Sequence, residues 1–518
     1  MTEMAQKPLL SFEEFASLTP EEMYSLLLEE RQDLQNATYT IAQLRQQVYG
    51  RKSEKSKTID THPTLPGLDH VFDETPETDE EPDPEEEKTE KPKKKTGRKP
   101  LPDHLPRERV IHDLDDSDKT CTCGHALHKI GEETSEQVEY IPARVKVIQH
   151  VRYKYACKCC ENTVKTAPVP AHPIPKSIAT PGLLAQIFIS KFDDHLPLYR
   201  QSEMWRRIGV DLNRATLSNW VIKAGRLCAP LVKLLQSHIV GGSYVQADET
   251  HVTFLKSAKT RQKAYMWVYK TGYDSRVSIV YDFQENREGK NATAFLDGFK
   301  GYLQGDAYSG YNDITSQKDV IRVGCMAHAR RKFVDVINMA PKKKGYSHQA
   351  VEKIKELYAI EARIRENELP PDKVKEYREQ YAKPLLADFK KSLDETYPKT
   401  PPKGPLGRAI AYSLNHWGDL ARYLEDGRLD IDNNACERAI KPFTVGRKNW
   451  LFVGNNAGAQ GGAALYSLIE TAKVNGVEPY QYLKYVFEMI PKLQEDQLGQ
   501  LLPWNCPEHL QNTFKQPA

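Results

Sequence analysis

The sequence predicts a multidomain α+β protein, and three stretches of the chain carry that prediction. A seven-residue apolar repeat near the N-terminus predicts a long helix, and a cysteine-rich segment around residues 121–160 predicts a small β domain. After residue 240, strand-like runs with alternating apolar residues are followed by helical segments, which predicts a sheet covered by helices. At 518 residues the chain is long enough for several domains, each with its own core.

The net charge of +2 conceals strongly charged blocks. Residues 73–88 are mostly Asp, Glu and Pro, whereas residues 91–99 are mostly Lys and Arg. A near-neutral total does not argue against a nucleic-acid partner, because the distribution of charge matters more. The N-terminal residues lack a secretory pattern, and no apolar run reaches the roughly 18 residues of a membrane helix. We therefore expect a cytoplasmic protein with no membrane partner.

Residues 1–50 are predicted to form a leucine-zipper-like helix. Leu27, Leu34, Ile41 and Val48 recur every seven residues, which is the spacing of a coiled-coil seam. A single amphipathic helix docked on its own protein shows the same pattern over so few repeats, and that alternative stays open. The spacing favours self-association into at least a dimer.

Residues 51–106 have the composition of a disordered charged linker, with few aromatic residues, many prolines and blocks of like charge. Arg98 and Lys99, in the basic part of this linker, are loosely similar to an arm that inserts into the minor groove of DNA. A solvated basic linker is the alternative interpretation.

Residues 107–172 are predicted to form a small zinc-binding β domain. Two groups of cysteines flank a stretch of alternating apolar and polar residues, as strands carrying two zinc knuckles would. We expect a structural zinc site, because four protein ligands leave no open coordination position. The expected ligands are Cys121, Cys123, Cys157 and Cys160, with Cys159, His125 and His128 as possible substitutes.

Residues 173–240 are predicted to be helical and to contain a helix-turn-helix-like DNA-binding domain. Ile208, Leu217 and Val221 are expected to supply its apolar faces. An ordinary pair of core helices has a similar pattern and remains the alternative. The residues expected to contact phosphates and base edges are Arg214, Thr216, Ser218, Asn219 and Lys223.

Two carboxylates occur in strand-like runs of residues 241–347. Asp248 lies in residues 244–255, and Asp306 lies in a second run, residues 302–309. Between them the pattern predicts a hairpin and a helix, and after them another strand and a basic helix. Three antiparallel strands, a helix, a fourth strand with an acid, and then β and α is the order of a ribonuclease-H-like core.

Residues 348–426 read as a charged helical insertion, and residues 427–465 complete the core with a third carboxylate, Glu437, near a helix start. Residues 466–518 form a predicted C-terminal helical domain and tail. Two acids on strands and one on a helix can hold two divalent metals about 3.5–4 Å apart. Taken singly each acid fits a structural role, and Glu437 with Lys441 fits an ordinary helix-surface pair.

Other residues near these acids are candidates for supporting roles. Glu249, Asp313 and His328 are expected beside the acids, and Trp450 fits either base stacking or the core. The cations expected to contact DNA phosphates are Arg330, Arg331, Lys332, Lys441, Arg447 and Lys448.

Taken together, these stretches resemble the DDE-type transposases of the insertion-sequence-sixty-six group. The resemblance runs from about residue 20 to 490. The matching stretches are residues 49–55, 155–160, 246–250, 305–311, 325–333, 434–442 and 467–476. The resemblance implies a leucine zipper, a zinc-binding domain, a ribonuclease-H-like catalytic core and a small helical C-terminal domain, with the catalytic acids at Asp248, Asp306 and Glu437.

The resemblance also implies metal-dependent cleavage of DNA at the ends of an insertion sequence and strand transfer into target DNA. Mg²⁺ or Mn²⁺ is expected at the three acids, because oxygen ligands suit these ions, and Zn²⁺ at the cysteines. The expected partners are terminal inverted repeats, target DNA, further copies of the chain and small accessory proteins of the same element. Such a protein is bacterial and is associated with the nucleoid when it is bound to DNA.

Two alternatives remain. One is a dimeric, zinc-containing DNA-binding regulator whose acids are structural, and the other is an inactive element copy. Only the transposase requires the three carboxylates to converge.

Overall fold

The computed structural model describes residues 19–20, 22–23, 145–156, 164–168, 170–255, 260–339 and 345–511. The zipper positions, Arg98, Lys99 and the four expected zinc ligands lie outside these ranges. The chain divides into two compact units, residues 74–169 and the rest of the chain.

In the smaller unit, the described residues form a short antiparallel hairpin. Strands β1 (Lys154–Ala156) and β2 (Val164–Thr166) pair with Lys154 opposite Thr166. The Arg152 side chain donates a hydrogen bond to the carbonyl of Ala167 beside them. The alternating pattern predicted strands between the cysteine groups, but residues 145–153 are not in a strand and β1 begins only at Lys154.

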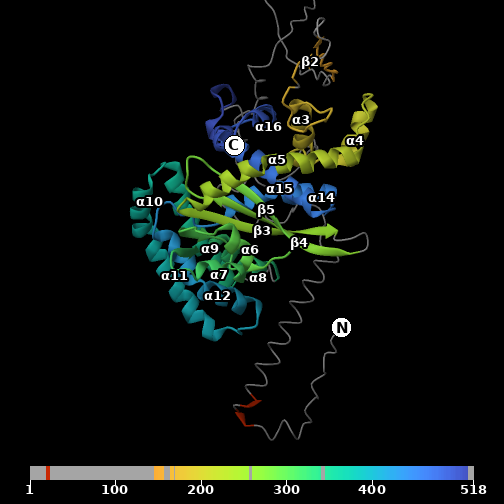
Figure 1. Cartoon of the computed structure of the whole chain (residues 1–518). Helices are drawn as coiled ribbons and strands as arrows, with labels where there is room; N and C mark the ends of the chain where they lie inside the picture. Colours follow the sequence, from red (N-terminus) through yellow and green to blue (C-terminus); the bar gives the residue numbers. More distant parts are fainter. Residues whose placement is uncertain are drawn as a thin grey trace, which may run out of the picture. The chain divides into compact units, whose positions relative to one another are not determined.

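The larger unit is organised around a twisted mixed sheet with strand order β5-β4-β3-β6-β7 (Figure 1). The first three strands are antiparallel, β6 runs parallel to β3, and β7 runs parallel to β6. A short strand, β8 (Phe452–Val453), pairs in parallel with the far end of β3. The strands are β3 (Tyr244–Leu255), β4 (Arg261–Thr271), β5 (Ile279–Gln284), β6 (Gly301–Gln304) and β7 (Val320–Val323).

Helices pack on both faces of this sheet, because successive side chains of each strand point to opposite faces. On one face, Tyr269 stacks on Phe295 of α6 (Gly289–Phe295), with ring centroids 3.7 Å apart. On the other face, Tyr281 donates to the carbonyl of Ala439 and stacks on Tyr466. Ala439 belongs to α14 (Asn434–Trp450), and Tyr466 belongs to α15 (Asn456–Val474).

The long helix α5 (Arg214–Val240) packs closely along α15. A Cβ atom at Gly225 would lie 2.2 Å from the Cα of Gly461, so the two backbones touch where both residues are glycine. The buried side chains of α3 (Pro181–Phe192), α5, α15 and α16 (Pro479–Met489) belong to the same core as the sheet. The expected domain boundaries at residues 240 and 465 therefore do not divide separate cores. The helix α15 continues across residue 465.

The expected helix-turn-helix corresponds to α4 (Leu198–Arg207), a turn, and α5. Asn213 caps α5 by accepting from the backbone N–H of Thr216 at 2.9 Å. Leu217 and Val221 are buried, as predicted, but Ile208 is 55% exposed. The prediction for Ile208 was wrong because α4 ends at Arg207 and the chain turns there.

Residues 345–431 are helical and contribute to a second core together with α8 (Met326–Met339). Within this insertion, Arg378 and Glu361 form a buried ion pair. Its α-helices are α9 (Tyr346–Glu366), α10 (Pro371–Tyr377), α11 (Lys383–Thr396), α12 (Pro405–Asn415) and α13 (Trp417–Ala421). Shorter turns complete the larger unit: η3 (Ser309–Tyr311), α7 (Asn312–Thr315), the π-helical η4 (Arg378–Ala382), η5 (Tyr397–Lys399), η6 (Arg422–Leu424), η7 (Ile490–Lys492), η8 (Glu495–Leu501), η9 (Pro503–Asn505) and η10 (Glu508–Leu510).

None of the helices within the described ranges is both long enough and apolar enough to span a membrane.

Candidate active site

Asp248 lies near the middle of β3, the central strand of the sheet. Its partner across the sheet is Val268, whereas the next residue, Glu249, lies opposite Trp267. Since alternate residues face opposite sides, Asp248 points to the face that α14 and α15 cover, and Glu249 points to the face that α6 covers. The two adjacent acids are therefore in different environments.

Asp306 lies two residues past the end of the neighbouring strand β6. The sequence analysis placed it within a strand, but β6 ends at Gln304 and the chain turns. The backbone N–H of Tyr308 donates to Asp306 Oδ1 at 2.9 Å, which is a local turn contact typical of aspartate. β6 runs parallel to β3, with Gln304 paired to Gln246. The chain that leaves β6 therefore carries Asp306 alongside the part of β3 that contains Asp248.

Glu437 lies in the first turn of α14, as the sequence predicted. Two contacts join this helix start to the sheet: Asn433 Nδ2 donates to the carbonyl of Ala247 at 2.9 Å, and Cys436 Sγ lies 3.6 Å from the carbonyl of Val268. The residue that Asn433 contacts directly precedes Asp248 in the chain. The helix that carries the third acid is thus fixed to the strand that carries the first.

A buried polar network, which the sequence analysis missed, holds this arrangement together. Gln246 donates to Gln304 at 3.0 Å and to the carboxylate of Asp430 at 2.9 Å, and Gln304 donates to the carbonyl of Asp430 at 2.8 Å. The hydroxyl of Tyr244 also donates to Gln304. The sequence contained a signal for this network, because a glutamine precedes both Asp248 and Asp306 by two residues. Both glutamines are buried.

Asp248 differs electrostatically from Glu437, which pairs with Arg331 at 3.5 Å and with His328 at 3.7 Å. Burial of its carboxyl group raises the pKa of Asp248 well above its ordinary value of 3.8. The negative charges of Glu249, Glu437 and Asp306 act in the same direction. Among the described residues, no Lys, Arg or His forms an ion pair with Asp248. A carboxylate whose pKa neighbouring carboxylates raise in this way suits an oxygen-preferring divalent cation.

A cleft of about 350 Å³ opens beside Asp306. Its lining contains both acidic and basic residues. Two of the basic ones lie over aromatic rings: Lys332 is 4.5 Å from the ring centre of Tyr412, and Arg287 is 3.6 Å from that of Tyr308. Cations over aromatic rings suit a nucleic acid, which offers phosphates and flat bases. Its lining includes Arg287, Asp306, Tyr308, His328, Arg331 and Lys332.

The expected phosphate-binding cations fall into different settings. Arg331 and Lys332 line the cleft, but Arg330 does not, and burial lowers its pKa. Arg447 donates to Thr250 Oγ1 at 2.8 Å and to the carbonyl of His251, so it ties α14 to β3. Of the other residues expected to contact DNA, Thr216 and Ser218 are partly buried. The exposed ones are Arg214, Asn219, Lys223, Lys441 and Lys448.

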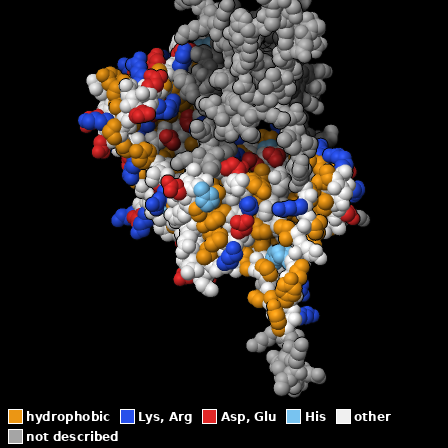
Figure 2. Space-filling model, turned by 90° about the horizontal axis from the view of Figure 1, so that it is seen from above, with side chains coloured by type: hydrophobic (Ala, Val, Ile, Leu, Met, Phe, Trp, Pro, Cys, Tyr) orange, Lys and Arg blue, Asp and Glu red, His pale blue; other side chains and the backbone are white. Residues whose placement is uncertain are grey.

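The face drawn in Figure 2 does not by itself outline a path for DNA. In the face drawn in Figure 2, the basic side chains of the described residues are interspersed with acidic and hydrophobic ones rather than gathered in a single patch. The cleft is therefore a better guide to a binding path than overall charge.

The residues expected to assist the acids also lie in different surroundings. Glu249 is held by Arg287 Nε at 2.7 Å and by the hydroxyl of Tyr311 at 2.8 Å. His328 lies in the cleft, with Nδ1 3.7 Å from Glu437 Oε1. Asp313, in contrast, is exposed on α7 and does not line the cleft. Trp450 packs edge-on against Phe443 beside the core, which fits the core interpretation.

Comparison with protein families assigns most of the chain. Residues 176–461 match the model described as "Transposase IS66 family", and residues 118–161 match the "zinc-finger binding domain of transposase IS66". Residues 467–504 match the "IS66 C-terminal element", and residues 37–110 match "Transposase C of IS166 homeodomain". The second of these matches supports Zn²⁺ binding, and the set of domains implies DNA binding.

Similar proteins occur in Sinorhizobium fredii (strain NBRC 101917 / NGR234). The "Uncharacterized protein y4jD" is 35% identical over 486 residues, which cover 90% of this chain and 93% of that protein. The "Uncharacterized protein y4hP" is 32% identical over 433 residues, which cover 80% of this chain and 77% of that protein.

Proposed function

The chain belongs to the IS66 transposase family, and we propose that it cleaves the ends of an insertion sequence and joins them to target DNA through Asp248, Asp306 and Glu437. The observation that carries this proposal is their placement, on the central strand, at the end of the adjacent parallel strand and at the start of the helix packed on the central strand. A regulator with structural acids has no need for this convergence.

We further propose that the catalytic core is ribonuclease-H-like. Three antiparallel strands followed by two parallel ones, in the order β5-β4-β3-β6-β7, support this assignment. So does the position of the helical insertion, which separates β7 from the helix with the third acid. The insertion then supplies part of the cleft wall, through Tyr412.

The donor set fits Mg²⁺ or Mn²⁺, because Asp248, Asp306 and Glu437 offer carboxylate oxygens whose mutual repulsion a cation would relieve. Asp248 and Asp306 would hold one ion, and Asp248 and Glu437 the other. Two ions bound in this way activate an attacking water or 3′-hydroxyl and stabilise the leaving oxygen of an in-line displacement.

The chain's own residues would position the DNA for this reaction. Arg331 and Lys332 face the cleft, where they would hold phosphates on either side of the scissile bond. Asn433 and the Gln246–Gln304–Asp430 network would keep α14 in register with β3. The Arg287–Glu249 pair would fix the strand segment that carries Asp248 from the opposite face.

For the parts of the chain outside the described residues, we propose structural Zn²⁺ at Cys121, Cys123, Cys157 and Cys160 and self-association through the zipper segment. The zinc-finger match supports the first proposal. Accessory proteins of the same element remain proposed partners, and we expect the protein to act on DNA in the bacterial cytoplasm.

The proposal is tested by cleavage and strand-transfer assays on the element's own end DNA with Mg²⁺, with Mn²⁺ and with chelator. The wild type should nick the ends only with metal, and Asp306→Asn should abolish nicking while DNA binding is retained. Asp297→Asn is a matched control, since Asp297 is exposed beyond α6 and does not line the cleft. DNA binding without nicking by the wild type, with accessory proteins present, would instead favour a regulator.

A further inference from the structure

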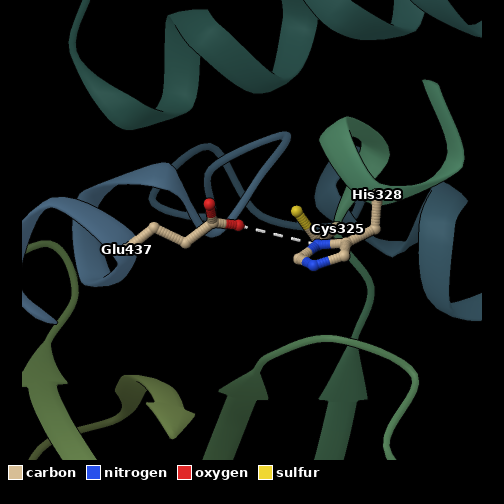
Figure 3. Close-up of side chains that lie close together, drawn as sticks. All are labelled: Cys325, His328 and Glu437. Carbon is tan, nitrogen blue, oxygen red and sulfur yellow. Dashed lines mark ion pairs between the residues drawn. The ribbon is translucent and has the colours of Figure 1, made fainter. Parts of the chain in front are cut away.

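Three side chains of different chemistry converge beside the cleft. Cys325 lies just before α8, His328 lies in its first turn, and Glu437 lies in the first turn of α14. One donor atom from each lies within 4.8 Å of the other two. Figure 3 shows the thiol, the imidazole and the carboxylate pointing toward one another. Among the described residues this is the one such group of metal-binding donors.

Within this group, the two atoms of the His328–Glu437 ion pair have no hydrogen bond. His328 Nδ1 and Glu437 Oε1 are both buried and without a hydrogen bond, although they face each other at 3.7 Å. That separation is too long for a direct hydrogen bond. It is close to the roughly 3.3–3.5 Å between two ligand atoms of a tetrahedral ion with metal–ligand bonds of about 2.0–2.1 Å. An ion between them would satisfy both atoms.

The donor types select the kind of ion. Mg²⁺ takes oxygen ligands and retains water, so it has little affinity for a thiol or an imidazole. A thiolate, an imidazole and a carboxylate together suit Zn²⁺ and related thiophilic divalent ions. Cys325 is buried, and its Sγ accepts a hydrogen bond, at 3.2 Å, from the backbone N–H of Asn433. Binding of such an ion would release the thiol proton to solvent.

We propose that Cys325, His328 and Glu437 form a second metal site, selective for thiophilic divalent ions such as Zn²⁺, and that its occupation inhibits DNA cleavage. The inhibition rests on the proposed function, because Glu437 is shared between this site and the catalytic acids. A carboxylate held by Zn²⁺ beside Cys325 and His328 is withdrawn from Asp248 and Asp306. The three protein ligands leave a fourth position for water or a DNA phosphate.

Cobalt spectroscopy on the full chain tests the site without DNA or activity. The metal-free protein is titrated with Co²⁺, which fills both the zinc-finger segment and this site. Each thiolate-bound Co²⁺ contributes a thiolate-to-cobalt charge-transfer band, and the zinc-finger contribution is common to the wild type and the variants. The band should therefore be stronger in the wild type than in Cys325→Ser, by the contribution of one further site. Co²⁺ at the all-carboxylate site gives no such band.

Two further variants keep this test decisive. Cys506→Ser removes a buried thiol elsewhere in the larger unit and should retain the band. His328→Gln keeps the thiol but removes a ligand and should weaken Co²⁺ binding at least about tenfold. The melting temperature of each variant reports whether it is folded. A band of equal strength in the wild type and Cys325→Ser, or no band in the folded wild type, overturns the proposal.

The regulatory half has a separate readout. In Mg²⁺-dependent cleavage, free Zn²⁺ should inhibit the wild type, and the concentration for half inhibition should rise at least about tenfold in Cys325→Ser, each compared with its own zinc-free rate. Equal inhibition of both overturns the regulation while the spectroscopic result on the site stands. If the wild type fails to cleave under any metal, the proposed function fails, and the cobalt titration still decides the site.

Discussion

Glu361 in the helical insertion is buried and Asp248 in the sheet is half-buried, but only Glu361 has a cation against it. Arg378 donates to the two carboxylate oxygens of Glu361 at 2.8 and 2.7 Å, and the Arg378 and Glu361 side chains are 3% and 7% exposed. Around Asp248 the neighbours are further acids, which raise its pKa. A buried acid that the protein neutralises itself supports the fold, whereas one that it leaves repelled is suited to bind an external cation.

Asp248 differs in the same way from Glu249, the next residue of β3. Glu249 is as shielded as Glu361, and Arg287 and Tyr311 satisfy it. Asp248 accepts a hydrogen bond only from the backbone N–H of Glu249, at 2.9 Å, within the part of the chain that the structure describes. One step along a strand thus separates a neutralised acid from an unneutralised one.

The largest expected effect is on catalysis at Asp248. Asp248→Asn should reduce cleavage by at least about 10³-fold, because loss of a metal ligand removes several kcal/mol of transition-state stabilisation. The free energy of unfolding without metal should stay equal or rise, since a repelled charge is removed. Single-turnover cleavage and denaturant unfolding measure the two quantities. A variant that cleaves normally, or that is strongly destabilised, would show that Asp248 is a structural acid like Glu361.

Glu361→Gln should show the opposite pattern, with a large loss of stability. The substitution leaves the Arg378 guanidinium buried without its counter-charge, which typically costs about 3–5 kcal/mol. Arg378 would keep its hydrogen bond to the carbonyl of Tyr423, at 2.8 Å, which softens the loss. Denaturant unfolding at neutral pH measures it.

Glu379→Gln is the control for that measurement. Glu379 pairs with Lys383 one turn away on the exposed surface, so its change should stay within about 0.5 kcal/mol. Equal effects of the two substitutions would mean that burial of the Glu361–Arg378 pair contributes little to the fold.

The sequence predicted the succession of strands and helices along the chain, the helical segment after β7 and a helix start at Glu437, because these depend on local patterns. It did not predict which acids lack a cation. Arg287 follows Glu249 by 38 positions, and Arg378 follows Glu361 by 17, so these pairings arise from tertiary packing. The end of β6 and the exposure of Ile208 were also missed, since element boundaries depend on turns that apolar periodicity does not resolve.

A third acid gives the smallest and most finely resolved test. Burial raises the pKa of Asp282 on β5 to about 6, and Gln284 Nε2 donates to it at 2.8 Å. With a folded pKa above the ordinary 3.8, Asp282 favours the folded state fully only below that ordinary value. This contribution is lost as the pH rises through about 6.

Asp282→Asn should therefore match the wild type near pH 4 and become more stable above about pH 6, by about 1–2 kcal/mol because partial exposure screens the charge. Denaturant unfolding of both proteins across that range gives the difference directly, and subtraction removes the titration of all other groups. Because Asp282 is unneutralised but has no cluster of acids around it, its substitution should leave Mg²⁺-dependent cleavage intact. A gain in stability together with a loss of cleavage would extend the catalytic set to β5, and a stability difference that does not vary with pH would contradict the burial of its charge.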